Sequence, residues 1–143
     1  MSQTINMLNE IYQNATMGVQ GTELLISKTE ELEFSGKLKN YVNKYNQIKA
    51  DASKLLVENG ESPQETTAME KANLWMGVQL NTLIDKTPSH MAEMLIQGST
   101  MGIIKSTKDK NSHKDVDEKC LKLEDELVTL QQDYIEDMKQ YLK

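Results

Sequence analysis

The sequence predicts an all-α fold, with two helical hairpins and a crossover helix between them in one domain of 143 residues. Three observations predict it. Apolar residues recur at steps of three and four over long stretches, the spacing of one helix face. Proline, which interrupts helices, occurs only twice. The chain also repeats itself weakly. We expect the hairpins at residues 4–59 and 88–142, and the crossover at residues 62–84.

The first helix is expected from Thr4 to about Glu33. One face carries Ile5, Leu8, Tyr12, Ala15, Val19, Thr22 and Ile26. Gly18 and Gly21 lie inside this helix, where each costs about 1 kcal/mol relative to alanine. Their presence indicates that a neighbouring helix approaches closely. Ser35-Gly36 is predicted to form the tight turn that ends the segment.

The second helix is expected from Gly36 to Asn59. Its apolar face carries Leu38, Tyr41, Tyr45, Ile48, Ala52 and Leu55. Asn59-Gly60 ends the helix, because glycine readily adopts the left-handed conformation that follows a helix end. Since the break before this helix is short, the first two helices are expected to run antiparallel.

The crossover helix is expected to start at Ser62-Pro63-Gln64-Glu65, in which Ser62 and Glu65 can cap the first turn reciprocally. It extends to about Ile84. Its apolar face carries Met69, Ala72, Met76, Leu80 and Leu83, with Trp75 beside them.

The second hairpin begins with another cap and proline, Thr87-Pro88, and its first helix is expected to end near Lys108. The residues expected to point inward are Met91, Met94, Leu95, Gly98, Met101 and Gly102. Residues 108–117 are polar and predict a turn, after which Ser112 or Asp115 caps the last helix. That helix reaches about Tyr141, with a seam of Val116, Cys120, Leu123, Leu127, Leu130, Tyr134, Met138 and Tyr141.

The internal repeat pairs the two hairpins. Residues 16–19 match residues 100–103 at an offset of 84 residues. Val42, Asp51 and Leu56 match Val128, Asp137 and Leu142 at an offset of 86 residues. We interpret the match as a duplication. The alternative is coincidence between two amphipathic helices.

Four short stretches carry a family resemblance: residues 14–19, 74–76, 98–103 and 137–142, which read NATMGV, LWM, GSTMGI and DMKQYL. Through them the chain resembles small uncharacterised ferritin-like proteins of Gram-positive anaerobic bacteria. The resemblance covers nearly the whole chain. It implies a ferritin-like four-helix bundle, and for these small proteins it implies no established activity.

The metal motif of ferritin-like enzymes is missing. Their di-metal sites use Glu-x-x-His, because residues three apart share a helix face. Here His90 has Thr87 at that spacing and His113 has Lys110. The sequence therefore predicts no di-iron or di-manganese site and no cofactor.

The mid-helix positions expected to face such a site also lack carboxylates. They hold Met17-Gly18 and Met101-Gly102, with Asn46 and Gln132 near the corresponding points of the other two helices. An amide has the shape of a carboxylate without its charge. Asn46 and Gln132 are either buried amides that set the helix register, or they face solvent or a neighbouring subunit; we favour the second interpretation.

The remaining candidates each have a structural explanation that we favour. His90, Met91, Met94 and Met101 share one helix and could hold a soft ion such as Cu(I), but methionine is also a common core filler. His90 and Glu93 could form an acid–base pair or a surface pair near the helix start. Cys120 could be reactive or simply buried. We expect no catalytic residues.

Charge and composition exclude further classes. The net charge is −6 and all sixteen basic residues are lysine, which argues against nucleic-acid binding and arginine clamps. Residues 115–126 and 28–39 are charge-rich and are interpreted as solvated helix faces. One cysteine, no visible signal peptide and no long apolar run lead us to expect a cytoplasmic protein without membrane insertion.

Two functional hypotheses follow. The first is a non-enzymatic structural or protein-interaction module on a ferritin-like scaffold, self-associating as a dimer through its tyrosine-containing seams (Tyr41, Tyr45, Tyr134 and Tyr141). The second is a metal- or small-ligand-binding protein, or a weak oxidoreductase, with a site at a subunit interface. That site would have to use His90, His113, Glu93 or the methionines.

Overall fold

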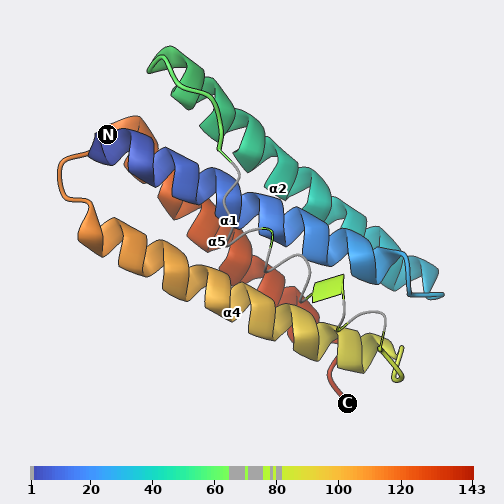
Figure 1. Cartoon of the computed structure of the whole chain (residues 1–143). Coiled ribbons are helices and arrows are strands. Elements are labelled where there is room, and N and C mark those ends of the chain that lie inside the picture. Colours follow the sequence, from blue (N-terminus) through green and yellow to red (C-terminus); the bar gives the residue numbers. More distant parts are fainter. Residues whose placement is uncertain (1, 65–69, 71–75, 78, 80–81) are drawn as a thin grey trace.

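The fold is all-α, as predicted. A computed structural model describes residues 2–64, 70, 76–77, 79 and 82–143. It contains four long helices, α1 (Gln3–Ile26), α2 (Leu32–Glu58), α4 (Pro88–Ser112) and α5 (Glu118–Lys139), and no strand among the described residues (Figure 1). None of the helices in these ranges has the length and apolar character needed to cross a bilayer.

The helices pack as a four-membered bundle. Figure 1 shows α1 and α2 running in opposite directions, and α4 and α5 likewise. The most extensive contacts are between α1 and α2 and between α4 and α5, while α1 also packs on α4 and α2 on α5. Side chains from all four helices therefore meet along one axis.

The first turn was predicted wrongly. It lies between Ile26 and Leu32, and Ser35-Gly36 belongs to the first turns of α2. The reason is Phe34, which is 1% exposed and whose ring packs edge-on against Tyr141 with centroids 4.8 Å apart. Starting α2 before Phe34 places this ring on the face that carries Leu38, and that burial outweighs the weak helix propensity of Gly36.

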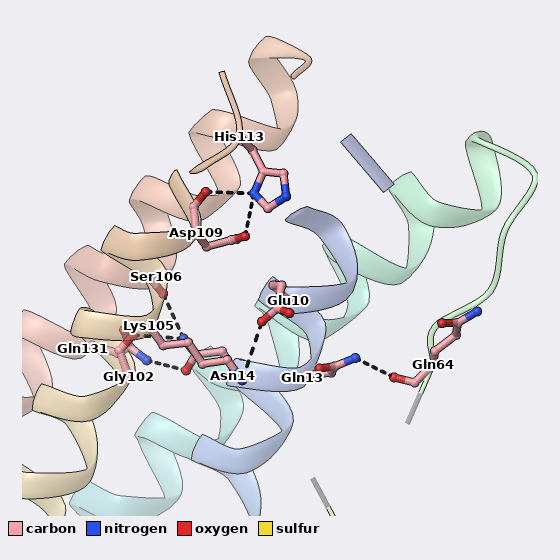
Figure 2. A network of polar contacts seen from close by, with 10 residues as sticks. All are labelled: Glu10, Gln13, Asn14, Gln64, Gly102, Lys105, Ser106, Asp109, His113 and Gln131. Atoms are coloured by element: carbon pink, nitrogen blue, oxygen red, sulfur yellow. Dashed lines mark hydrogen bonds and ion pairs between the residues drawn. The ribbon is translucent and has the colours of Figure 1, made fainter. Parts of the chain in front are cut away.

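The predicted crossover helix, residues 62–84, falls largely on residues outside the described ranges. The residues that lead into it, up to Gln64, are described. The Gln64 amide N–H donates to Asn9 Oδ1 at 3.2 Å, and Gln13 Nε2 donates to the Gln64 carbonyl at 3.1 Å (Figure 2). These bonds fasten the start of the connection along α1.

The second pair of helices begins and ends near the predicted positions. Thr87 caps α4 as expected, since its hydroxyl accepts the His90 amide N–H at 3.2 Å. The helix continues one turn beyond Lys108. The cap of α5 is Asp117, rather than Ser112 or Asp115, and its side chain makes no capping bond.

The inward face of α4 differs from the prediction. Met101 is 71% exposed and Gly98 is also exposed. The buried residues are instead Met91, Ala92, Leu95, Ser99, Ser106 and Asp109. Hydrophobicity alone misplaces this face because half of its buried side chains are polar ones that find hydrogen-bond partners inside the bundle.

The buried positions repeat along the chain. Six buried positions of α2 are Phe34, Leu38, Tyr41, Tyr45, Ile48 and Ala52. The residues 86 positions later, Cys120, Glu124, Leu127, Gln131, Tyr134 and Met138, are all buried in α5. Similarly, Leu8, Ile11, Ala15, Thr22 and Leu25 of α1 precede Ala92, Leu95, Ser99, Ser106 and Asp109 of α4 by 84 positions, and all are buried. The two helix pairs thus present matching faces to the core.

Tyrosines fill much of that core. Tyr41 and Tyr134 stack with ring centroids 4.1 Å apart, and Tyr45 lies 6.2 Å from Tyr134. The Tyr134 hydroxyl hydrogen-bonds Thr22 Oγ1 at 2.9 Å, and the Tyr41 hydroxyl donates to Asp137. The three rings are at most 2% exposed. These three rings pack within the chain, whereas Tyr141 of the predicted seams is half-buried.

Candidate functional site

Two glycines at equivalent positions make room for two core side chains. A Cβ on Gly18 would lie 2.6 Å from the Tyr45 ring, and a Cβ on Gly102 would clash with the Gln131 amide. Gly18 and Gly102 belong to the repeated stretches, and Tyr45 and Gln131 are separated by the repeat offset. Gly18 therefore makes room for Tyr45 between α1 and α2, and Gly102 makes room for Gln131 between α4 and α5. The middle of the bundle is filled.

A hydrogen-bonded network starts from this centre. Gln131 Nε2 donates to Asn14 Oδ1 at 2.9 Å. Asn14 Nδ2 donates to the Gly102 carbonyl at 3.0 Å and to Ser106 Oγ at 2.8 Å (Figure 2). Because a carbonyl only accepts, the orientation of the Asn14 amide is determined, and Asn14 joins α1 to both α4 and α5.

At its inner end the network reaches Tyr45. The side chains of Gln131 and Ser99 lie beside its hydroxyl. Burial raises the pKa of Tyr45 to about 12, although these two polar neighbours act in the opposite direction. The tyrosine is consequently a neutral phenol throughout the neutral pH range.

At its outer end the network reaches two buried carboxyl groups. Glu124 lies beside both Ser106 and Asp109. Glu124 is 1% exposed and Asp109 is 8% exposed. Two ionised carboxylates can only accept, so a hydrogen bond between them requires a shared proton. We call Asp109 and Glu124 the carboxyl pair.

His113 closes the outer end. Its Nδ1 lies 2.9 Å from Asp109 Oδ1 and 2.9 Å from the Asp109 carbonyl oxygen (Figure 2). Both are acceptors, so Nδ1 carries a hydrogen in either charge state of the ring. The side chain of His113 is 18% exposed, which makes it the contact between the pair and solvent.

Both acids of the carboxyl pair have raised pKa values. Burial, followed by the neighbouring charge of Asp109, raises the pKa of Glu124 to about 8. Burial also raises the pKa of Asp109, although its hydrogen bonds and His113 act in the opposite direction. One oxygen of each carboxyl, Asp109 Oδ2 and Glu124 Oε2, is buried without a donor from the described residues. The raised pKa values favour a proton on the pair at pH values where ordinary carboxyls have lost theirs.

We call the continuous set from core to surface the buried polar chain; it comprises Tyr45, Gln131, Asn14, Ser106, Glu124, Asp109 and His113. Beside it, Lys105 Nζ pairs with Glu10 Oε2 at 3.6 Å, at the edge of α1 and α4 (Figure 2). The buried polar chain includes residues of all four helices. It can hold a proton and set the helix register.

The histidines proposed from the sequence do not come together. His90 Nδ1 lies 3.4 Å from Glu93 Oε2 in an exposed pair at the start of α4, in agreement with the surface interpretation. His113 follows the other end of the same helix, about 35 Å away at 1.5 Å per residue. Within this chain, the two histidines cannot share a ligand.

The methionines also do not form one cluster. Met91 is fully buried, Met94 is half-buried and Met101 is exposed. Met91 and Met94 pack with the core, which supports the core-filler interpretation for them. The expectation that Met101 points inward was wrong.

Cys120 is a buried residue, as favoured from the sequence. It is 1% exposed, and its thiol points at the Thr4 carbonyl at 3.9 Å. Burial, and then the nearby acidic groups Glu124 and Asp109, raise the pKa of Cys120 to about 12. In the closed structure the thiol is therefore protonated and shielded from reagents.

Asn46 and Gln132 are both exposed, in agreement with the favoured interpretation. The inner positions lie one residue earlier, at Tyr45 and Gln131. Since one residue turns a helix by about 100°, this small error in register moves a side chain from the core to the surface.

The sequence interpretation missed the carboxyl pair. Glu124 belongs to a stretch interpreted as a solvated face, and Asp109 was placed in a turn because α4 was expected to end at Lys108. The spacing around Glu124 could have indicated that it is buried. It lies four residues after Cys120 and three before Leu127, so it shares the apolar face of α5.

No protein-family model, curated protein or solved structure matches the chain. Within the described ranges, no three histidine, cysteine or acidic side chains are grouped so that they could hold a metal ion. The geometry of the site is therefore the basis for assigning a function.

Proposed function

We propose that this protein is a non-enzymatic structural or protein-interaction module on a ferritin-like scaffold. In this proposal, hairpins 4–59 and 88–142 arose by duplication and are joined by the crossover helix 62–84. The matching buried positions of α1 with α4, and of α2 with α5, support the duplication. They are more specific than the few identities in the sequence.

One observation carries the non-enzymatic part. At mid-bundle, the position where a ferritin-like enzyme would hold two metal ions, Tyr45 packs on Gly18 and Gln131 packs on Gly102. The Tyr45 hydroxyl also lies beside the Gln131 side chain. These neutral side chains offer neither the space nor the negative charge that two hard cations require.

Elemental analysis of protein purified without chelators tests this proposal. We expect iron, manganese, zinc and copper each well below one ion per chain after dialysis. A stoichiometric metal would overturn the proposal in favour of the metal-binding alternative. Gly102→Asp, which places a carboxylate at mid-bundle, provides a control: loss of stability without metal uptake is the expected outcome.

A further inference from the structure

The carboxyl pair is not required by packing. At the equivalent positions of the first helix pair, Leu25 and Leu38 are 3% and 0% exposed. Two leucines are therefore accommodated at the equivalent buried positions. Replacing such a contact by two acids loses apolar burial and adds an ionisable group in a place poorly reached by water.

Among the described residues, no lysine forms an ion pair with Asp109 or Glu124. The titratable groups around it are Glu10 on α1, Lys105 on α4, Cys120 on α5, and His113 after α4. Lys105 is engaged by Glu10, and the ion pair that reaches Asp109 from the described residues comes from His113. Glu10 adds negative charge. When the shared proton leaves, two buried carboxylates face each other with one imidazole beside them.

We propose that Asp109 and Glu124 form a one-proton latch, which holds α5 against α1 and α4 and opens when the shared proton is lost. With the proton in place, the carboxyls bond to each other and the end of the bundle is closed. Without it, like charges in a dry environment repel, and hydration is gained by separating the helices. The closed state thus binds one more proton than the open state.

The part that can open lies next to the pair. The Asp115 amide N–H donates to Gln3 Oε1 at 3.0 Å, and the Asp117 amide N–H donates to Thr4 Oγ1 at 3.2 Å. These bonds tie the 113–117 segment to the start of α1, and the first is exposed. A shallow hollow bounded by Thr4, Leu8 and Cys120 already borders the thiol. A small movement of the first turn of α5 would uncover Cys120.

The direction of the pH effect follows from the proton count. In an open state, Glu124 regains the ordinary pKa of 4.5, whereas in the closed state its pKa is about 8. Between these values the open state has lost the proton and the closed state has kept it. The ratio of open to closed molecules should therefore rise about tenfold per pH unit in this window and level off above it.

Infrared spectroscopy tests the shared proton. At pH 7 we expect the wild-type protein to show the C=O absorption of a protonated carboxyl group, and Glu124→Gln to lack it. Asp109→Asn should also lack it, because its amide can donate to an ionised Glu124. A wild-type spectrum with only carboxylate bands at pH 7 would overturn the proposal.

Alkylation of Cys120 tests the opening. The rate for the wild-type protein divided by that for Glu124→Gln cancels the titration of the thiol itself. We expect this ratio to rise about tenfold per pH unit between pH 5.5 and pH 7.5. Glu126→Gln, which changes an exposed acid on the same helix, should behave like the wild type. A ratio independent of pH would refute the latch.

A second probe separates local opening from unfolding. The near-ultraviolet circular dichroism of the stacked tyrosines should stay constant over the pH range in which Cys120 becomes reactive. If it collapses together with the protection of the thiol, the pair controls the stability of the whole bundle and the local latch is wrong.

Discussion

At the scale of single residues, two glycines in the bundle centre are required by the packing of their neighbours. Gly18 and Gly102 lie inside long helices, where glycine is unfavourable by about 1 kcal/mol relative to alanine. The structure shows the compensation, because the Tyr45 ring and the Gln131 amide occupy the space that a Cβ would need. Gly98, also in α4, has no such neighbour and gives a matched comparison.

Gly18→Ala should destabilise the protein by about 1–2 kcal/mol, measured by urea unfolding. Displacing the buried Tyr45 ring costs about 1–3 kcal/mol, and the better helix propensity of alanine returns part of it. Gly98→Ala, where no atom lies within 4 Å of the new Cβ, should stabilise by up to about 1 kcal/mol. Equal effects of the two variants would contradict this account of the centre.

Glu124 should give the protein an inverted pH dependence over part of the range. Its pKa is raised on folding, so the unfolded chain loses this proton first, and the free energy of unfolding falls as pH rises from about 4.5 towards 8. The slope attributable to Glu124 is at most about 1.4 kcal/mol per pH unit. Chemical unfolding at several pH values should show this slope in the wild type and its loss in Glu124→Gln. Parallel curves for the two proteins would exclude it.

At the scale of helices, the two pairs share a pattern of burial but differ in chemistry. Leu25 and Leu38 are buried in the first pair, where Asp109 and Glu124 are buried at the equivalent positions of the second. Asn14 of α1 then joins the second pair through Gly102, Ser106 and Gln131. The first pair contributes mainly apolar packing, whereas the second buries several polar groups, of which Asp109 Oδ2, Glu124 Oε2 and Gln131 Oε1 have no hydrogen-bond partner among the described residues.

The double variant Asp109→Leu/Glu124→Leu should be more stable than the wild type at pH 8, by about 1–4 kcal/mol. Buried charged groups replaced by well-packed apolar residues commonly give gains of this size. Either single variant should be less stable than the double, because it leaves one buried carboxyl without its partner. Thermal unfolding of the four proteins measures this cycle, and a double variant weaker than the wild type would contradict it.

Asn14→Ala should destabilise the protein by at least about 2 kcal/mol in chemical unfolding. The substitution leaves the Gly102 carbonyl and the Ser106 and Gln131 side chains without a buried partner, and each such loss costs about 1–3 kcal/mol. Asn46→Ala, on the exposed face of α2, should change stability by no more than about 0.5 kcal/mol. Similar losses at the two positions would show that the network is dispensable.

At the scale of the whole molecule, the surface that favours self-association differs from the tyrosine-containing seams expected from the sequence. Of the tyrosines that suggested a dimer, Tyr41, Tyr45 and Tyr134 are buried inside the chain and Tyr141 is half-buried. Met101 and Ile104, which are 71% and 49% exposed, lie one turn apart on the outer face of α4. Neighbouring exposed apolar side chains of this kind are a feature of association surfaces.

We therefore propose that the protein dimerises through this face of α4. Sedimentation velocity at tens of micromolar should show a dimer for the wild type and a monomer for Met101→Lys/Ile104→Lys. The matched control is Lys54→Glu, which changes the charge of an exposed residue on a different helix, α2. A monomeric wild type, or a dimer that survives the double substitution, would refute this surface.

The sequence by itself determined the helical content, the seams of α2 and α5 and the burial of Cys120, because these follow from spacing within a single helix. Only the tertiary structure decided the first turn, the inward face of α4 and the buried polar chain. Phe34 moved the turn by packing on Tyr141, and Asp109 and Glu124 are buried because they meet each other. Contacts between residues far apart in the chain produce no periodic pattern in the sequence. The hydrophobicity of a polar side chain is the same whether or not the fold gives it a hydrogen-bond partner.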